Sequence, residues 1–116
     1  MRHHGSCHCG RVAFDVEGEV AGLIDCNCSI CLRRGAVLWF VPRAQLELAS
    51  GEEDLASYTF NKHAIAHRFC RHCGIHTFGE GTHPSTGEPM AAINVRCLPE
   101  LDWSELPVQH FDGRAL

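Results

Sequence analysis

The chain has 116 residues, of which 45% are apolar and 21% are charged, and its formal net charge is −4. This length predicts a single domain, residues 1–116, and the mild acidity gives no general attraction to nucleic acid. No stretch reaches the ~20 apolar residues of a membrane span, and the N-terminal residues lack the apolar core of a secretory signal. We therefore expect a cytoplasmic protein with neither membrane nor nucleic-acid partners.

Most predicted elements are short strands, because apolar and polar residues alternate along much of the chain. Residues 12–16 predict a half-buried strand, and residues 37–41 predict a buried strand that ends at Pro42. Within the second strand we interpret Trp39 and Phe40 as core residues. Shorter strands are expected at residues 23–24, 46–48, 58–60, 65–69, 75–78, 90–95 and 108–111.

The segments between these strands carry residues typical of turns. Residues 50–54 predict an acidic turn, residues 62–63 predict another turn, and residues 79–89 predict a loop rich in glycine and proline. Only residues 98–106 predict a short helical turn, with Asp102 as its N-cap. Many short strands separated by turns predict an all-β fold of stacked antiparallel sheets.

Eight cysteines and nine histidines stand out in so short a chain. Cysteines in this number form either disulfides or metal sites. Most of them fall into tight groups, whereas disulfide frameworks usually spread their cysteines to close long loops. We therefore predict metal sites, and the lack of an export signal agrees with reduced thiols. The groups are the pair Cys7-x-Cys9, the triplet Cys26-x-Cys28-x-x-Cys31 and the pair Cys70-x-x-Cys73.

The grouped cysteines divide into four and three ligands. Structural zinc sites take four protein ligands, whereas catalytic sites take three and keep an open position. The triplet is compact enough to hold one ion alone, so the two pairs are expected to meet across the fold. Cys97 lies in an apolar segment and is interpreted as a buried core residue. The predicted four-cysteine site comprises Cys7, Cys9, Cys70 and Cys73, and the open site comprises Cys26, Cys28 and Cys31.

Two interpretations of the triplet are open. Zinc with thiolate ligands is a poor Lewis acid but binds a further soft ligand well, so an open position favours thiol chemistry over hydrolysis. A histidine ligand would instead complete a second structural site. The candidate histidines are His8, His63, His67, His72 and His76.

Three segments around the cysteines carry a resemblance to a known family. They are Gly5-Ser-Cys-His-Cys-Gly10-x-Val12-x-Phe14, Cys26-Asn-Cys-Ser-Ile-Cys31 with Arg33-Arg34-Gly35, and Phe69-Cys-x-x-Cys-Gly74-x-x-x-Phe78. The C-terminal residues Leu101-Asp102 and His110-Phe111-Asp112-Gly113 match as well. Together they resemble the glutathione-dependent formaldehyde-activating (GFA) family, which also includes the centromere protein V domain. The resemblance covers nearly the whole chain, although Asn27 stands where many members have histidine.

The resemblance implies a β-tent fold, a structural zinc on the four-cysteine group and a catalytic zinc on the triplet. It also implies a carbon–sulfur lyase-type enzyme that reversibly condenses glutathione with formaldehyde to S-(hydroxymethyl)glutathione. Arg33 and Arg34 then become candidates for binding the carboxylates of this small-molecule thiol, unless they are solvated surface cations. The alternative is a non-enzymatic zinc-binding module of the same fold, and exposed edge strands would allow a homodimer.

Overall fold

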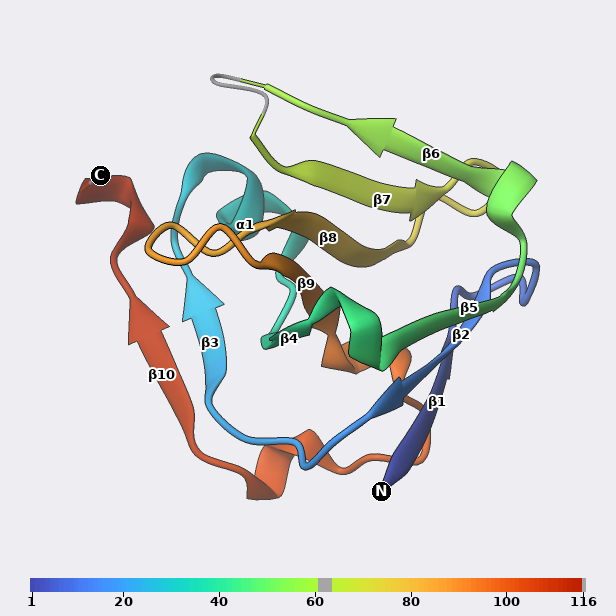
Figure 1. The fold of residues 1–116 in the computed structure, drawn as a ribbon, viewed down its shortest axis with the longest axis horizontal. Coiled ribbons are helices and arrows are strands. Elements are labelled where there is room, and N and C mark those ends of the chain that lie inside the picture. Colours follow the sequence, from blue (N-terminus) through green and yellow to red (C-terminus); the bar gives the residue numbers. More distant parts are fainter. Residues whose placement is uncertain (61–63, 116) are drawn as a thin grey trace.

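The fold of the computed structural model is built mostly from short strands (Figure 1). The structure describes residues 1–60 and 64–115, so the turn expected at residues 62–63 lies outside the described residues. The strands are β1 (Arg2–Ser6), β2 (Ala13–Glu17), β3 (Leu23–Cys26), β4 (Leu38–Pro42), β5 (Leu46–Ser50), β6 (Leu55–Tyr58), β7 (Ala66–Cys70), β8 (His76–Thr82), β9 (Pro89–Asn94) and β10 (Val108–Phe111). Among the described residues the α-helix is α1 (Ser29–Arg34), and short 3-10 helices cover Arg43–Gln45, Glu52–Asp54, Val95–Cys97, Trp103–Glu105 and Gly113–Ala115.

The strands form two sheets, which confirms the predicted all-β class. A three-stranded sheet has the order β1-β2-β5, and a seven-stranded sheet has the order β10-β3-β4-β9-β8-β7-β6. The pairings between described strands are antiparallel, as predicted, except that β10 runs parallel to β3 at one edge. This parallel edge pairs Phe111 with Cys26, so it brings the C-terminal segment beside the triplet.

The main core lies between the two sheets. The large apolar residues of the strand predicted at 12–16 are fully buried. The ring of Phe14 meets that of Phe78, on the larger sheet, edge to face with centroids 5.8 Å apart. Trp39 and Cys97 are buried as predicted. Burial of one large apolar side chain stabilises the fold by roughly 2 kcal/mol, because it removes apolar surface from water.

Hydrophobic periodicity does not reveal α1 or β1. The helix has only six residues, too few to establish a helical period, and it ends where Gly35 adopts a left-handed φ of 67°. β1 has the sequence Arg-His-His-Gly-Ser, which lacks large aliphatic residues, and only Gly5 in it is buried. The helical turn expected at 98–106 is confined to Trp103–Glu105, and Asp102 caps it as predicted by accepting a hydrogen bond from the N–H of Ser104.

Two further predictions are wrong in part. The loop expected at 79–89 begins later, because β8 continues to Thr82. Phe40 is not a core residue, since its side chain is 47% exposed whereas that of Trp39 is 3% exposed. Consecutive strand residues point to opposite faces, so Trp39 enters the main core and Phe40 lies on the outer face of the larger sheet. On this outer face a second cluster of buried residues comprises Cys31, Ala36 and Leu38.

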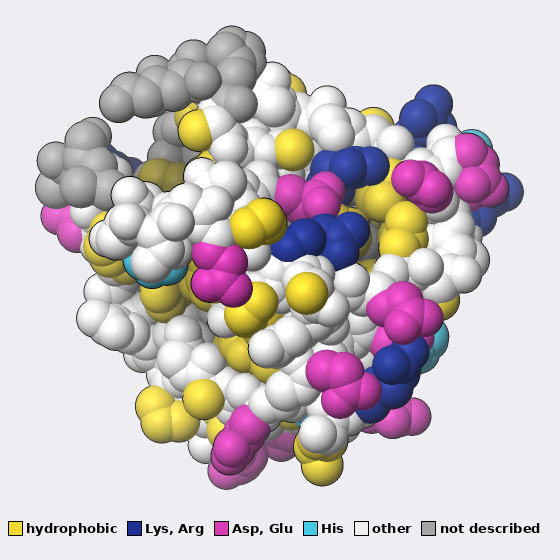
Figure 2. Space-filling view, in the orientation of Figure 1, with side chains coloured by type: hydrophobic (Ala, Val, Ile, Leu, Met, Phe, Trp, Pro, Cys, Tyr) yellow, Lys and Arg dark blue, Asp and Glu magenta, His cyan; other side chains and the backbone are white. Residues whose placement is uncertain are grey.

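The surface carries charges of both signs. Figure 2 shows acidic and basic side chains interspersed on one face of the molecule, without an extended basic patch there. That face therefore offers little attraction to a phosphate backbone. Within the part of the chain that the structure describes, no helix combines the length and the apolar character needed to cross a membrane.

Candidate functional site

Four cysteines from two distant turns meet in one group. Cys7 and Cys9 lie in the turn between β1 and β2, while Cys70 ends β7 and Cys73 lies in the turn that follows. Their Sγ atoms all lie within 4.8 Å of one another. The Sγ separation is 3.6 Å between Cys7 and Cys9 and 3.7 Å between Cys9 and Cys70. Four sulfurs ~2.3 Å from a tetrahedral zinc ion are ~3.8 Å apart, so this group fits zinc.

Backbone hydrogen bonds shape both turns around the sulfurs. The N–H of Val12 donates to Cys7 Sγ, and the N–H of His72 donates to Cys70 Sγ, each at 3.4 Å. Gly74 closes the second turn with a φ of 79°, which favours glycine, and its N–H donates to the carbonyl of Cys70 at 2.8 Å. The backbone of this chain therefore builds the knuckle geometry that the Cys-x-x-Cys-Gly motif predicts.

The four thiols differ in their tendency to ionise. Burial raises the pKa of Cys7 to about 11. Burial also opposes ionisation of Cys73, but the N–H groups of Cys9 and Ile75 outweigh it and lower the pKa of Cys73 to about 6. Hydrogen bonds from Arg11 lower the pKa of Cys9. Because some of these thiols resist ionisation, a cation is needed before all four can be thiolates.

The triplet brings together Cys26, Cys28 and Cys31. Their Sγ atoms also lie within 4.8 Å of one another, because β3 ends at Cys26 and α1 begins directly after Cys28. The N–H of Cys28 donates to Cys26 Sγ at 3.4 Å. Burial raises the pKa of Cys31 to about 12, whereas for Cys28 the N–H group of Cys31 and the neighbouring thiols outweigh burial and lower the pKa. The triplet thus offers three ligands, the number found in zinc sites with an open position.

Arg34 lies directly beside the triplet. Its Nη2 donates to Cys31 Sγ at 3.6 Å, and its Nη1 lies 3.0 Å from His67 Nδ1. The helix places it there, since residues three apart share one helical face. Arg33 is exposed and donates to the carbonyl of Ser29 in the same helix at 2.9 Å. Of the two arginines expected to bind substrate, Arg34 is therefore the one that adjoins the triplet.

No histidine joins either group of thiols within residues 1–60 and 64–115. A fourth histidine ligand therefore has no support in that part of the chain. His67 instead contacts Arg34, and His72 pairs with Asp54 at 2.6 Å. Both ring nitrogens of His76 are buried without a hydrogen-bond partner among the described residues.

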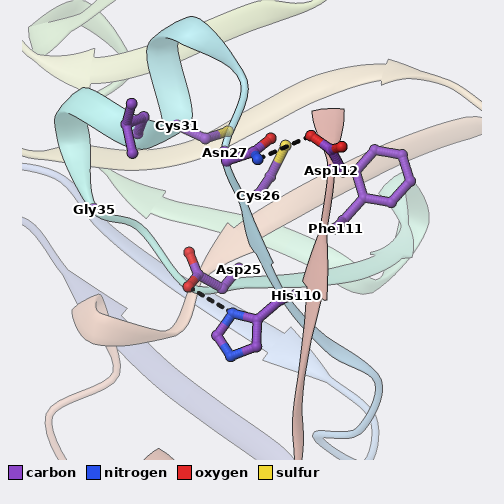
Figure 3. Close-up of a pocket in the computed structure, with 9 residues that line it drawn as sticks. Asp25, Cys26, Asn27, Cys31, Gly35, His110, Phe111 and Asp112 are labelled. Atoms are coloured by element: carbon purple, nitrogen blue, oxygen red, sulfur yellow. Dashed lines mark hydrogen bonds and ion pairs between the residues drawn. The ribbon is translucent and has the colours of Figure 1, made fainter. Parts of the chain in front are cut away.

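The C-terminal segment closes over the triplet, a contact that the sequence motifs do not reveal. The side chain of Asn27 accepts a hydrogen bond from the N–H of Arg114 at 2.9 Å. It also donates to Asp112 Oδ1 at 2.9 Å (Figure 3). A Cβ at Gly113 would lie 2.5 Å from Cys26 Sγ, so the backbone approaches this sulfur as closely as only glycine allows.

Two cavities meet at the triplet. The polar cavity, of about 310 Å³, is lined by Asp25, His110 and Asp112, and His110 Nδ1 lies 3.1 Å from Asp25 Oδ2 (Figure 3). The apolar cavity, of about 330 Å³, lies on the outer face of the seven-stranded sheet. Cys26 and Cys31 line both cavities. A small molecule can therefore reach the triplet from two sides of different polarity.

The fold and the two thiol groups define an all-β protein with two candidate metal centres. The family model of the glutathione-dependent formaldehyde-activating enzyme matches residues 2–111, so the chain belongs to the GFA family, as the sequence motifs predict. The chain is also similar to a protein of Rhodobacter sphaeroides known from a crystal structure. The two share 33% sequence identity with a TM-score of 0.78, over 91% of this chain and 99% of that chain.

Proposed function

We propose that this protein is a zinc-dependent carbon–sulfur lyase that forms and breaks glutathione–aldehyde adducts, as an S-(hydroxymethyl)glutathione synthase does. Family membership supports a glutathione-related, formaldehyde-activating role. The observation that carries the proposal further is the triplet, whose thiols open onto two cavities and have no fourth side-chain ligand among the described residues. In this proposal the four-cysteine group holds a structural zinc ion.

Three thiolate ligands suit thiol activation better than hydrolysis. A zinc ion held by Cys26, Cys28 and Cys31 would keep a substrate thiol ionised at neutral pH, below its ordinary pKa of ~8.5. In the reaction the thiol sulfur bonds to the aldehyde carbon, the carbonyl π electrons move to oxygen, and this oxygen takes up the thiol proton. The addition and its reverse change no oxidation state, so no oxidant or reductant is needed. Because reduced glutathione is required, we place the protein in the cytoplasm.

The side chains around the triplet support a way to orient glutathione. The guanidinium of Arg34, which contacts His67, would place positive charge beside the anionic substrate. Arg33, exposed on α1, is the candidate for a glutathione carboxylate. The carboxylates of Asp25 and Asp112 in the polar cavity suit the amino group of glutathione. We therefore assign the amino end of glutathione to the polar cavity, whereas Arg34 lines the apolar cavity close to the triplet.

Cys28→Ser tests the proposed function. Zinc-loaded wild-type protein should accelerate exchange between free glutathione, formaldehyde and their adduct, measured by NMR exchange spectroscopy. The substitution should lower this rate at least ~100-fold, because it removes one ligand of the open site. Elemental analysis should show loss of one zinc ion per chain, since the four-cysteine group is intact. Cys97→Ala is the matched control, because Cys97 belongs to neither group of thiols.

Wild-type protein that carries zinc on both groups but leaves the exchange rate unchanged would contradict the proposed function. A non-enzymatic zinc-binding module predicts that result. It also predicts that Cys28→Ser changes zinc content without changing any exchange rate. The two functions are therefore separated by the same pair of measurements.

A further inference from the structure

The apolar cavity beside the triplet is more hydrophobic than a formaldehyde adduct requires. Its volume of about 330 Å³ is that of a pocket for a small organic molecule. Formaldehyde adds a single carbon without a side chain to glutathione, so nothing in that adduct would fill the cavity. Its walls include the hydrocarbon side chains of Ile24, Ile30, Phe40, Phe60, Ile65 and Phe111.

The hollow is produced by side-chain size along one row of the sheet. Phe40, Ala92, Gly79 and His67 pair directly on neighbouring strands, so these positions share one face. Two small residues thus lie between two aromatic ones. The backbone does not require glycine at 79, since its φ lies outside the left-handed region and a Cβ would meet no atom closer than 3.6 Å. The missing side chain at this position therefore contributes open space.

Large apolar side chains at this cavity are exposed to water. Phe40 is 47% exposed, Ile65 is 49% exposed and Phe111 is 43% exposed. Contiguous exposed apolar surface is uncommon on soluble monomers and marks binding sites. A second hollow, of about 560 Å³, shares Phe40, Ile65 and Ala92 with the first and extends along β8 and β9. Apolar surface therefore runs from the triplet outward across the sheet.

We infer that the aldehyde used by this protein carries an apolar substituent, a medium-length alkyl chain or a phenyl group, which occupies the apolar cavity. This inference rests on the proposed function for the reacting groups. The sulfur bonds to the carbonyl carbon, the π electrons move to oxygen and the thiol proton ends there, so the substituent stays attached to the adduct carbon. Because Cys26, Cys28 and Cys31 line this cavity, an occupant lies beside the reacting carbon, which favours the substituent of a substrate over a docked protein segment.

Two glutathione thioethers test the inference without turnover. S-hexylglutathione mimics an adduct with an apolar substituent, and S-methylglutathione mimics one without. In isothermal titration of the zinc-loaded protein, the hexyl compound should bind at least ~10-fold more tightly, because each buried methylene adds to affinity. A smaller preference, or no binding of the hexyl compound, would overturn the inference.

Substitutions within the row locate the alkyl chain. Ala92→Leu should fill the hollow, because the added carbons take the space of the ligand. The preference for S-hexylglutathione over S-methylglutathione should then fall to less than ~3-fold. Ala49→Leu makes the same change at an exposed position of β5 and should keep the wild-type preference. Gly79→Ala is a milder second variant, since its added Cβ would lie 3.6 Å from the nearest atom, Cγ2 of Ile65. A cavity variant with a wild-type circular dichroism spectrum and an unchanged preference would overturn the inference.

Turnover measurements distinguish this inference from the proposed function. Exchange with glutathione is compared for formaldehyde and hexanal on the same zinc-loaded protein. Acceleration with formaldehyde, without a preference for the hexyl thioether, would keep the proposed function and overturn the inference. A hexyl preference that Ala92→Leu removes, without acceleration of either aldehyde, would keep the apolar ligand in the cavity and overturn the proposed reaction.

Discussion

His76 is held neutral by its surroundings. Burial, and then the charge of Arg34, lower the pKa of His76 to about 3. The ring of His67 lies 6.3 Å away, and the same two causes lower its pKa. Protonation of either ring in the folded state would add a second positive charge near Arg34 in a poorly solvated space. Near neutral pH, Arg34 is therefore the positive charge that this cluster presents to the triplet.

We predict that His76 makes the fold less stable in acid. The unfolded chain binds a proton at His76 below pH ~6.5, whereas the folded chain does so only near its pKa of about 3. The free energy of unfolding should therefore decrease as the pH falls through this range, by up to ~1.4 kcal/mol per unit. Between pH ~7 and pH ~5, the free energy of unfolding of His76→Leu, measured with urea, should decrease by about 2 kcal/mol less than that of wild type. His83→Leu, which removes an exposed ring, is the control, and equal losses in wild type and His76→Leu would contradict the prediction.

The cysteine groups could be predicted from the sequence, but the cluster around Arg34 could not. Cysteines two or three positions apart can chelate an ion with little help from the rest of the fold, so their spacing alone indicates a site. The contact between Arg34 and His67 joins residues 33 positions apart. It depends on where α1 lies relative to β7, which no local pattern specifies. The sequence does not predict the exposed position of Phe40 for a similar reason, because a continuous apolar run does not show which face is covered.

Among the elements, strands were easier to predict than the helix. A period of two is visible in four or five residues, as in β2, whereas α1 is too short to show a helical period. The helix nevertheless positions both Cys31 and Arg34, so α1, which the sequence does not predict, is the element that shapes the triplet. The sequence also does not predict the parallel pairing of β10 with β3, because pairing between distant strands leaves no local signal.

The segment after β10 should control the triplet, and Gly113→Ala tests this. The added Cβ would lie 2.5 Å from Cys26 Sγ and 3.0 Å from Cys28 Cβ, so the segment must move away. We expect zinc affinity at the triplet to fall ~10- to 100-fold, as when groups that support metal ligands are disturbed. Competition with a chromophoric chelator measures this, and the four-cysteine group should be unaffected. Gly81→Ala is the control, because its Cβ would meet no atom closer than 3.5 Å, and equal affinities in both variants would contradict the prediction.

At the scale of the whole molecule, the four-cysteine group joins turns that are far apart in sequence. Cys9 and Cys70 are separated by 61 positions, yet their sulfurs are 3.7 Å apart. A link that closes so long a loop limits the unfolded chain, and metal that binds only the folded state adds its binding energy to stability. The sequence predicts this link, because two isolated pairs can complete a tetrahedral site only by meeting. It does not predict the cavities, which arise where side chains from several strands leave space.

Loss of zinc from the four-cysteine group should therefore destabilise the protein far more than loss from the triplet. Structural zinc contributes on the order of 10 kcal/mol in small domains, comparable with the whole stability of a chain this size. Cys9→Ser, which alters an exposed thiol of that group, should lower the free energy of unfolding by at least ~4 kcal/mol. Cys28→Ser should lower it by less than ~2 kcal/mol, because the triplet closes no long loop. In thermal unfolding followed by circular dichroism, a chelator should bring the Tm of wild type close to that of Cys9→Ser. Equal destabilisation by the two substitutions would contradict the prediction that the four-cysteine group stabilises the fold more than the triplet does.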